Sequence, residues 1–171
     1  MEVALIVTFL AAMLVIALVV YLFLRDAERQ RQAEYRRSVM TEVLPNRLQA
    51  YERLSLYLDR IAPQSMAVRE QISVSTAKEL YLAMLNSVRM EFEHNVAMQI
   101  YITEASWKRV LRARDEVTKS LNEAIKGVAP DATALEFSAE FIEIGRNTCD
   151  FYVERAKEGL RKDVAGEFIA K

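Results

Sequence analysis

The feature that most constrains this sequence is an apolar segment at its start, which carries no charged residue from Val3 to Leu24. Its most polar side chain is Thr8, and Tyr21 lies close to its end. Its 22 residues would span roughly 33 Å as an α-helix, about the thickness of a bilayer's hydrocarbon core. A single segment satisfies its backbone groups within a bilayer only as a helix, so we predict a transmembrane helix over residues 3–24.

A cleaved signal peptide is the alternative interpretation of this segment. Signal peptides begin with a basic stretch, carry a shorter apolar run and end at a cleavage site of small residues. This sequence begins Met1-Glu2-Val3, without a basic residue, and its apolar run ends in Tyr-Leu-Phe-Leu before Arg25. The pattern therefore favours a retained anchor.

Basic residues follow the predicted span but do not precede it. Cytoplasmic flanks of membrane helices carry an excess of lysine and arginine, so this asymmetry predicts an outside N-terminus and a cytoplasmic C-terminal domain. The membrane-flanking residues are five arginines: Arg25, Arg29, Arg31, Arg36 and Arg37.

The segment 25–38 is strongly charged and contains no helix breaker. Its five arginines are offset by Asp26, Glu28 and Glu34, which leaves only a small basic excess. A polybasic patch that binds anionic lipid is one interpretation, but the small excess favours a solvated helical stalk that continues the anchor.

The rest of the chain is electrically balanced and rich in helix-forming residues. Beyond Leu24 it carries 23 basic and 23 acidic residues, because only Glu2 of the 24 acidic residues lies before that point. This balance argues against nucleic-acid binding. Glycine occurs four times and proline three times, which is typical of long helices with few turns. We therefore predict an all-α fold in which residues 39–171 form an antiparallel bundle of about four long helices.

Capping residues indicate where three of the bundle helices begin. Thr76 with Glu79, and Thr133 with Glu136, each have the spacing of a capping box. Thr103 is placed to cap a further helix. Each predicted start is followed by apolar residues at helical spacing, and the stripes of the four helices share this pattern: Leu44, Leu48, Tyr51, Leu54, Leu58, Ile61; Tyr81, Leu85, Val88, Phe92, Val96, Ile100; Trp107, Val110, Leu111, Val117, Leu121, Ile125; Phe137, Phe141, Ile144, Phe151, Val153, Leu160.

Proline and glycine indicate where helices end. Pro63 ends the first bundle helix, and Pro45 either kinks that helix or begins it. Residues 62–75 are predicted to be the longest loop. The last helix is predicted to run unbroken from about Ala134 to the C-terminus, where Gly145 either weakens it or allows a close contact with another helix.

Glu91 and His94 form the one motif that suggests metal chemistry. A Glu-x-x-His pair in a helix places a carboxylate and an imidazole on one face, as in half of a di-iron bundle site. A complete site needs a second such motif, and the chain has no other histidine. Ordinary polar contacts are therefore the favoured interpretation, and no cofactor is predicted.

Other chemical interpretations are weaker. Cys149 and His94 could form a nucleophile pair, but no third group to orient them is apparent, and small thiols are common in helix cores. Trp107 and the tyrosines of the bundle are expected in the core rather than in an interaction patch. Ala4, Thr8 and Ala12 form a small-residue row that could bring two anchors together.

Two stretches of the sequence resemble a family of uncharacterised short single-pass bacterial inner-membrane proteins with a cytoplasmic helical domain. The first is Leu48-Gln-Ala-Tyr-Glu-Arg-Leu54 with Leu58-Asp-Arg-Ile61. The second is Glu91-Phe-Glu-His-Asn95 with Gln99-Ile-Tyr-Ile-Thr103 and Trp107. The resemblance covers nearly the whole chain and implies a bacterial inner membrane. It implies no activity and assigns no functional residue.

These features together favour a non-catalytic function. We expect a membrane-anchored cytoplasmic scaffold, adaptor or accessory subunit, whose partners are the lipid bilayer and either further copies of the chain or another protein. No small-molecule substrate is evident. The alternative is a metal-dependent helical-bundle enzyme that uses Glu91 and His94.

Overall fold

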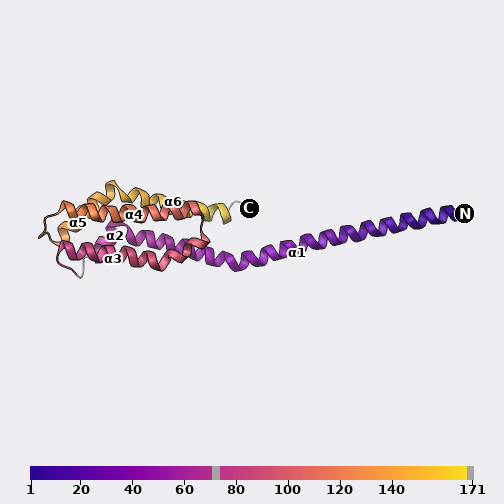
Figure 1. The fold of residues 1–171 in the computed structure, drawn as a ribbon, viewed down its shortest axis with the longest axis horizontal. Coiled ribbons are helices and arrows are strands. Elements are labelled where there is room, and N and C mark those ends of the chain that lie inside the picture. The colour runs from indigo at the N-terminus through magenta and orange to yellow at the C-terminus, as the bar shows by residue number, and fades with distance from the viewer. Residues whose placement is uncertain (71–73, 169–171) are drawn as a thin grey trace. The chain divides into compact units, whose positions relative to one another are not determined.

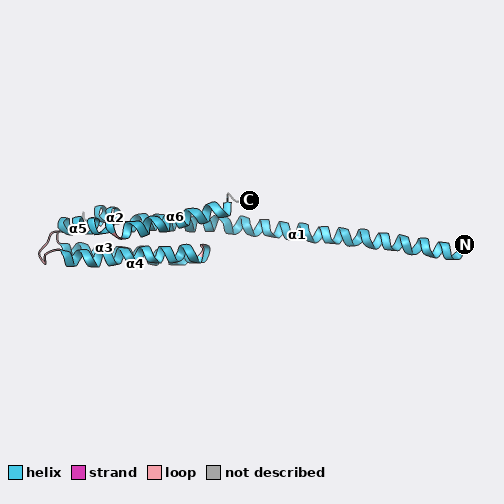
Figure 2. Cartoon of the chain, turned by 90° about the horizontal axis from the view of Figure 1, so that it is seen from above, coloured by secondary structure: helices cyan, strands magenta, loops and turns pink. Residues whose placement is uncertain are grey.

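The structure is a computed structural model that describes the backbone of residues 1–70 and 74–168. The side chains of residues 3–8, 11–12, 33, 36–37, 39 and 167–168 lie outside this description. The described residues form helices joined by short connections, with no strand among them (Figures 1 and 2). The predicted all-α fold class is therefore confirmed. The chain divides into two units, residues 1–45 and 46–171.

The first unit is the N-terminal part of helix α1, which extends over Glu2–Ile61. The helix includes the whole predicted stalk and passes through Pro45 without a break, which answers the question that the sequence left open at this proline. The large apolar side chains between Met13 and Leu24 are all at least half exposed.

No helix in the described part of the chain is long and apolar enough to cross a membrane. The predicted span, residues 3–24, includes residues 3–8 and 11–12, whose side chains lie outside the described residues. The predicted boundaries at residues 24 and 38 remain predictions.

The second unit is a helical bundle in which neighbouring long helices run antiparallel (Figures 1 and 2). Its first element is residues 46–61 of α1. Its remaining elements are as follows: α2 Pro63–Glu70, α3 Ala77–Asn95, the 3₁₀ helix η2 Val96–Tyr101, α4 Glu104–Gly127, α5 Ala134–Asn147 and α6 Cys149–Phe168.

The core lies between these helices and contains most of the predicted stripe residues. Its largest fully buried side chains come from all sides of the bundle: Tyr57, Phe137, Phe141, Leu54, Leu58, Ile61, Met66, Leu80, Met84, Leu121, Val110 and Val117. The prediction is wrong for three stripe residues, which are exposed: Leu48 at 37%, Ile100 at 75% and Phe151 at 60%. Ile100 and Phe151 follow a helix break that shifts the phase of the side chains, at Asn95 and at Thr148 respectively.

All three predicted caps are present. The side chain of Thr103 accepts the backbone N–H of Ser106 at 3.2 Å. The capping boxes at Thr76 and Thr133 are both complete, and hydrogen bonds from these threonines lower the pKa of the paired Glu79 and Glu136.

The starts of α3 and α5 are also joined to each other by the backbone. Thr76 and Thr133 form an antiparallel bridge. The N–H of Ala77 donates to the carbonyl of Ala132, and the N–H of Ala134 donates to the carbonyl of Ser75, both at 3.0 Å. Two caps that the sequence predicts independently therefore lie side by side.

The predicted loop at residues 62–75 is only partly a loop. Pro63 ends α1, as expected, but it is also the first residue of α2, a position that suits proline because its missing N–H has no helical partner there. Residues 71–73 of the predicted loop lie outside the described residues.

The predicted single C-terminal helix is wrong, because it breaks at Thr148 into α5 and α6. The Thr148 hydroxyl donates to the carbonyl of Ile144 at 2.7 Å and lies 2.8 Å from the Ser120 hydroxyl of α4. The Thr148 N–H donates to the carbonyl of Gly145 at 3.2 Å. Local bonds of a threonine side chain compete in this way with the helical pattern.

Candidate functional site

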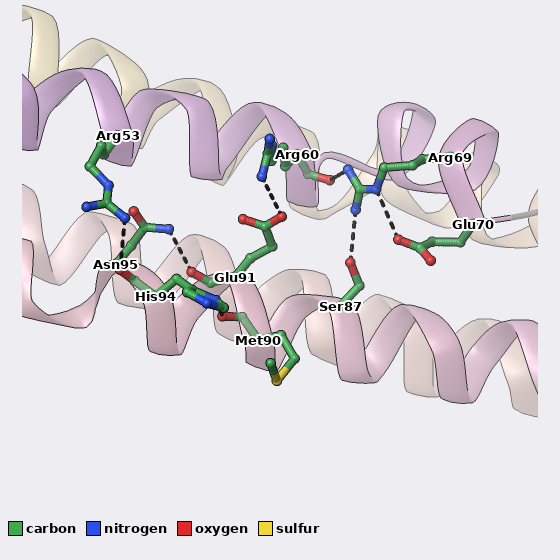
Figure 3. Close-up of polar contacts among 9 residues, drawn as sticks. All are labelled: Arg53, Arg60, Arg69, Glu70, Ser87, Met90, Glu91, His94 and Asn95. Carbon is green, nitrogen blue, oxygen red and sulfur yellow. Dashed lines mark hydrogen bonds and ion pairs between the residues drawn. The ribbon is translucent and has the colours of Figure 1, made fainter.

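The candidate site is a cleft between α1 and α3 on the surface of the bundle, with a volume of about 360 Å³. Figure 3 shows its polar contacts, in which arginines of α1 and α2 reach toward α3. Its lining combines charged, polar and apolar side chains: Arg53, Leu56, Tyr57, Arg60, Ser87, Met90, Glu91, His94 and Asn95.

Arg69 of α2 holds one end of the cleft together (Figure 3). Its Nη1 donates to the carbonyl of Arg60 at 3.2 Å, and its Nη2 donates to the hydroxyl of Ser87 at 2.9 Å. Its Nε donates to Glu70 at 3.0 Å. One guanidinium therefore ties the end of α1 to α3, and each of its three nitrogens donates a hydrogen bond within the protein.

Arg53 and Arg60 of α1 are less fully engaged. Arg60 Nη1 donates to Glu91 Oε1 at 2.8 Å, and Arg53 Nη2 donates to the carbonyl of His94 at 3.3 Å. A guanidinium has five N–H donors, so each of these arginines can bind a further acceptor. The cleft can therefore bind an anionic group.

Glu91 and His94, the candidate metal ligands, both line this cleft. Glu91 forms the ion pair with Arg60, and His94 Nδ1 lies 2.8 Å from the carbonyl of Met90. A carbonyl only accepts, so this contact places a proton on Nδ1. Within the described residues, no three side chains of histidine, cysteine, aspartate or glutamate gather as a metal site would require.

The second chemical candidate, Cys149, lies in a different environment from His94. It is fully buried at the start of α6, and burial raises the pKa of its thiol to about 11. The hydroxyls of Ser120 and Thr148 are its hydrogen-bonding neighbours. At neutral pH the thiol is therefore protonated, which is not the reactive form of a cysteine.

Most of the aromatic residues that were predicted in the core lie in it or against it: Tyr51 and Tyr57 are buried, and Tyr81 and Trp107 pack against the core, whereas Tyr101 is not part of it. Trp107 stacks on Phe92 with 5.8 Å between ring centroids, and Phe92 also contacts Tyr57. Tyr57 is 1% exposed, and burial raises the pKa of its hydroxyl, which therefore stays neutral. In the described part of the chain this hydroxyl has no hydrogen-bond partner.

The arginines that were predicted to flank a membrane belong to the first unit, and none of them lines the cleft. Arg25, Arg29 and Arg31 are exposed, and the side chains of Arg36 and Arg37 lie outside the described residues. Their predicted role beside a bilayer remains a prediction.

Sequence analysis did not single out Arg53, Arg60 and Arg69. The spacing of the first two carries a signal, because residues seven apart lie on the same face of a helix. The part played by Arg69 could not be predicted, since it depends on a helix that was expected to be a loop.

The fold and the cleft together define an all-helical bundle protein with a long N-terminal helix and a basic surface cleft. The chain belongs to the family of unknown function DUF7935, whose sequence model matches residues 2–166. The expectation of an uncharacterised family that covers nearly the whole chain is thereby confirmed. Comparisons with curated proteins and with solved structures give no match.

Proposed function

We propose that this protein is an adaptor of the bacterial inner membrane, in which residues 3–24 anchor the chain and the bundle binds another protein in the cytoplasm. One observation supports the proposed anchor: large apolar side chains are exposed at nearly every position from Met13 to Leu24. Successive residues of a helix point in directions about 100° apart, so these side chains surround the helix on all sides.

Exposure on all sides distinguishes lipid from a water-soluble partner. A helix that packs on one protein surface has an apolar stripe and a polar opposite face, whereas a helix that is apolar all round is buried or lies in a membrane. Phe23 and Leu14, for example, are 72% and 69% exposed. Lipid surrounds a single membrane helix on all sides, so a bilayer is the simplest environment for this segment.

The part of α1 that follows the proposed anchor supports a spacing role for the stalk. Residues 25–38 are helical throughout. Fourteen helical residues extend about 21 Å. A helix of this length would hold the bundle away from the bilayer surface, where a partner can reach it.

Charges placed in the middle of the anchor are expected to release the protein from the membrane. Aspartate costs about 2.5–3.5 kcal/mol at the centre of a membrane helix, so Leu14→Asp with Leu18→Asp should strongly disfavour insertion. The protein should then move from the carbonate-resistant membrane fraction to the soluble fraction. As a control, Gln30→Asp with Ser38→Asp adds the same charge to the stalk and should leave it in the membrane fraction. A wild-type protein in the soluble fraction would refute the anchor.

The orientation is tested with a reporter fused after Lys171. We expect a reporter that needs the cytoplasm to be active and one that needs the periplasm to be silent, because all five flanking arginines follow the span. As a control, the same reporters fused before Met1 should give the opposite pattern. Periplasmic activity of the C-terminal fusion would show that the charge asymmetry does not set the topology.

A further inference from the structure

We propose that the cleft between α1 and α3 is a docking site for an acidic amphipathic helix of a partner protein. The biological role of this site rests on the proposed adaptor function, which it deepens by naming the chemistry of the partner. The argument uses the shape, the charge and the spacing of the cleft.

The shape of the cleft favours a helix over a small molecule. Pockets for small molecules usually bury 70–90% or more of the ligand surface. Here three lining residues are about half exposed, with Leu56 at 52%, Met90 at 44% and the Arg60 side chain at 49%. A groove this open would leave much of a small ligand in water, whereas a third helix can lie along it and cover these side chains.

The charge of the cleft favours an acidic partner. Arg53 and Arg60 contribute two positive charges and Glu91 one negative charge, which leaves the lining with one net positive charge when His94 is neutral. Glu91 is 22% exposed and its contact is with Arg60, so it is the less accessible member of that pair. Carboxylates of a partner can reach the remaining guanidinium donors, which bind them with charge-assisted hydrogen bonds.

The spacing of the cleft residues matches one side of a helix. Arg53 and Arg60 are seven residues apart, about 10.5 Å along α1. Leu56 lies between them on α1, and Met90 lies across the cleft on α3. A partner helix with acidic residues at positions i and i+7 and leucines at i+3 and i+4 repeats this order of charged, apolar and charged contacts.

The test uses the full chain in mild detergent and a designed, fluorescein-labelled helical peptide. The peptide carries glutamate at i and i+7 and leucine at i+3 and i+4. Binding is followed by fluorescence anisotropy. We expect the wild-type protein to bind this peptide and the variant with Arg53→Glu and Arg60→Glu to bind it at least about tenfold more weakly, because two attractions become repulsions.

Two further variants separate recognition from misfolding. Arg53→Glu alone leaves the Arg60–Glu91 ion pair intact and should still weaken binding by about threefold. Arg89→Glu is the matched control, since this exposed arginine of α3 does not line the cleft, and it should leave binding unchanged. The fluorescence of Trp107, the chain's single tryptophan, reports whether each variant is folded.

A charge swap makes the result decisive. A peptide with lysine in place of both glutamates should bind the doubly reversed variant more tightly than the wild-type protein. Three results would each overturn the docking site. The wild-type protein does not bind the glutamate peptide, or every variant binds both peptides equally. In the third, the protein self-associates without peptide, and the double charge reversal abolishes this self-association. None of these results depends on a bilayer, so they leave the test of the membrane anchor separate.

Discussion

Replacing Phe137 by alanine is expected to lower the free energy of unfolding of the bundle by about 3–5 kcal/mol. The side chain is fully buried and stacks on Phe141 with 6.3 Å between ring centroids. It also forms a T-shaped pair with Tyr81, with 6.2 Å between the ring centroids. Removal of the ring therefore forfeits its burial, leaves a cavity between α5 and α3, and breaks two aromatic contacts at once.

Trp107 provides a measurement that is specific to the bundle. It is the only tryptophan, and it stacks on Phe92 within the second unit, so its fluorescence during urea unfolding follows the bundle. The matched control is Phe151→Ala on α6. Phe151 is 60% exposed, and its replacement should change the unfolding free energy by less than about 1 kcal/mol. Similar losses in the two variants would contradict the placement of Phe137 in the core.

Local signals in the sequence were sufficient to place three helix starts. A threonine cap acts within one helical turn, so Thr76, Thr103 and Thr133 could be recognised without knowledge of the rest of the fold. The apolar stripes were equally informative where a helix is unbroken. Val110, Val117 and Leu121 of α4 are all buried as predicted.

The helix breaks depend on contacts between helices and were therefore missed. At Thr148 the hydroxyl both donates to the carbonyl of Ile144 and lies beside Ser120, a residue 28 positions earlier in the chain. The local bond alone could not predict the break, because Thr118 makes the same bond to the carbonyl of Arg114 within the unbroken α4. The misplacement of Phe151 follows directly, since the new helix begins with a different phase.

The candidate site was predicted only in part. Glu91 and His94 attracted attention through their spacing, and both line the cleft. The sequence could not show that Arg60 pairs with the carboxylate of Glu91, because these residues come from different helices and are 31 positions apart. The sequence favoured ordinary polar contacts for Glu91 and His94 over a metal half-site, but it could not name Arg60 as the partner of Glu91.

Replacing Gly145 by alanine is expected to destabilise the bundle by about 1–2 kcal/mol, against the intrinsic preference of a helix for alanine. A Cβ atom at this position would lie 2.5 Å from Cγ and 2.8 Å from Cβ of Pro63. The Pro63 ring is rigid and buried at the start of α2, so it cannot turn away as a flexible side chain would. Overpacking typically costs about 1–3 kcal/mol, and contacts this short with a rigid ring favour the upper part of that range, about 2–3 kcal/mol. Subtracting the roughly 1 kcal/mol that alanine gains over glycine in a helix interior leaves a net loss of about 1–2 kcal/mol.

Gly166 of α6 is the matched control, because a Cβ atom there would meet no heavy atom within 4 Å. Gly166→Ala should therefore leave the unfolding free energy unchanged or raise it by up to about 1 kcal/mol, with a sign opposite to that of Gly145→Ala.

The contact with Pro63 is isolated by a double-mutant cycle measured by urea unfolding. Pro63→Ala should recover most of the loss caused by Gly145→Ala, because it removes the ring atoms that the new methyl group meets. If the two substitutions prove additive, the cost at Gly145 does not come from the approach of α2, and the close packing of α2 on α5 would have to be rejected.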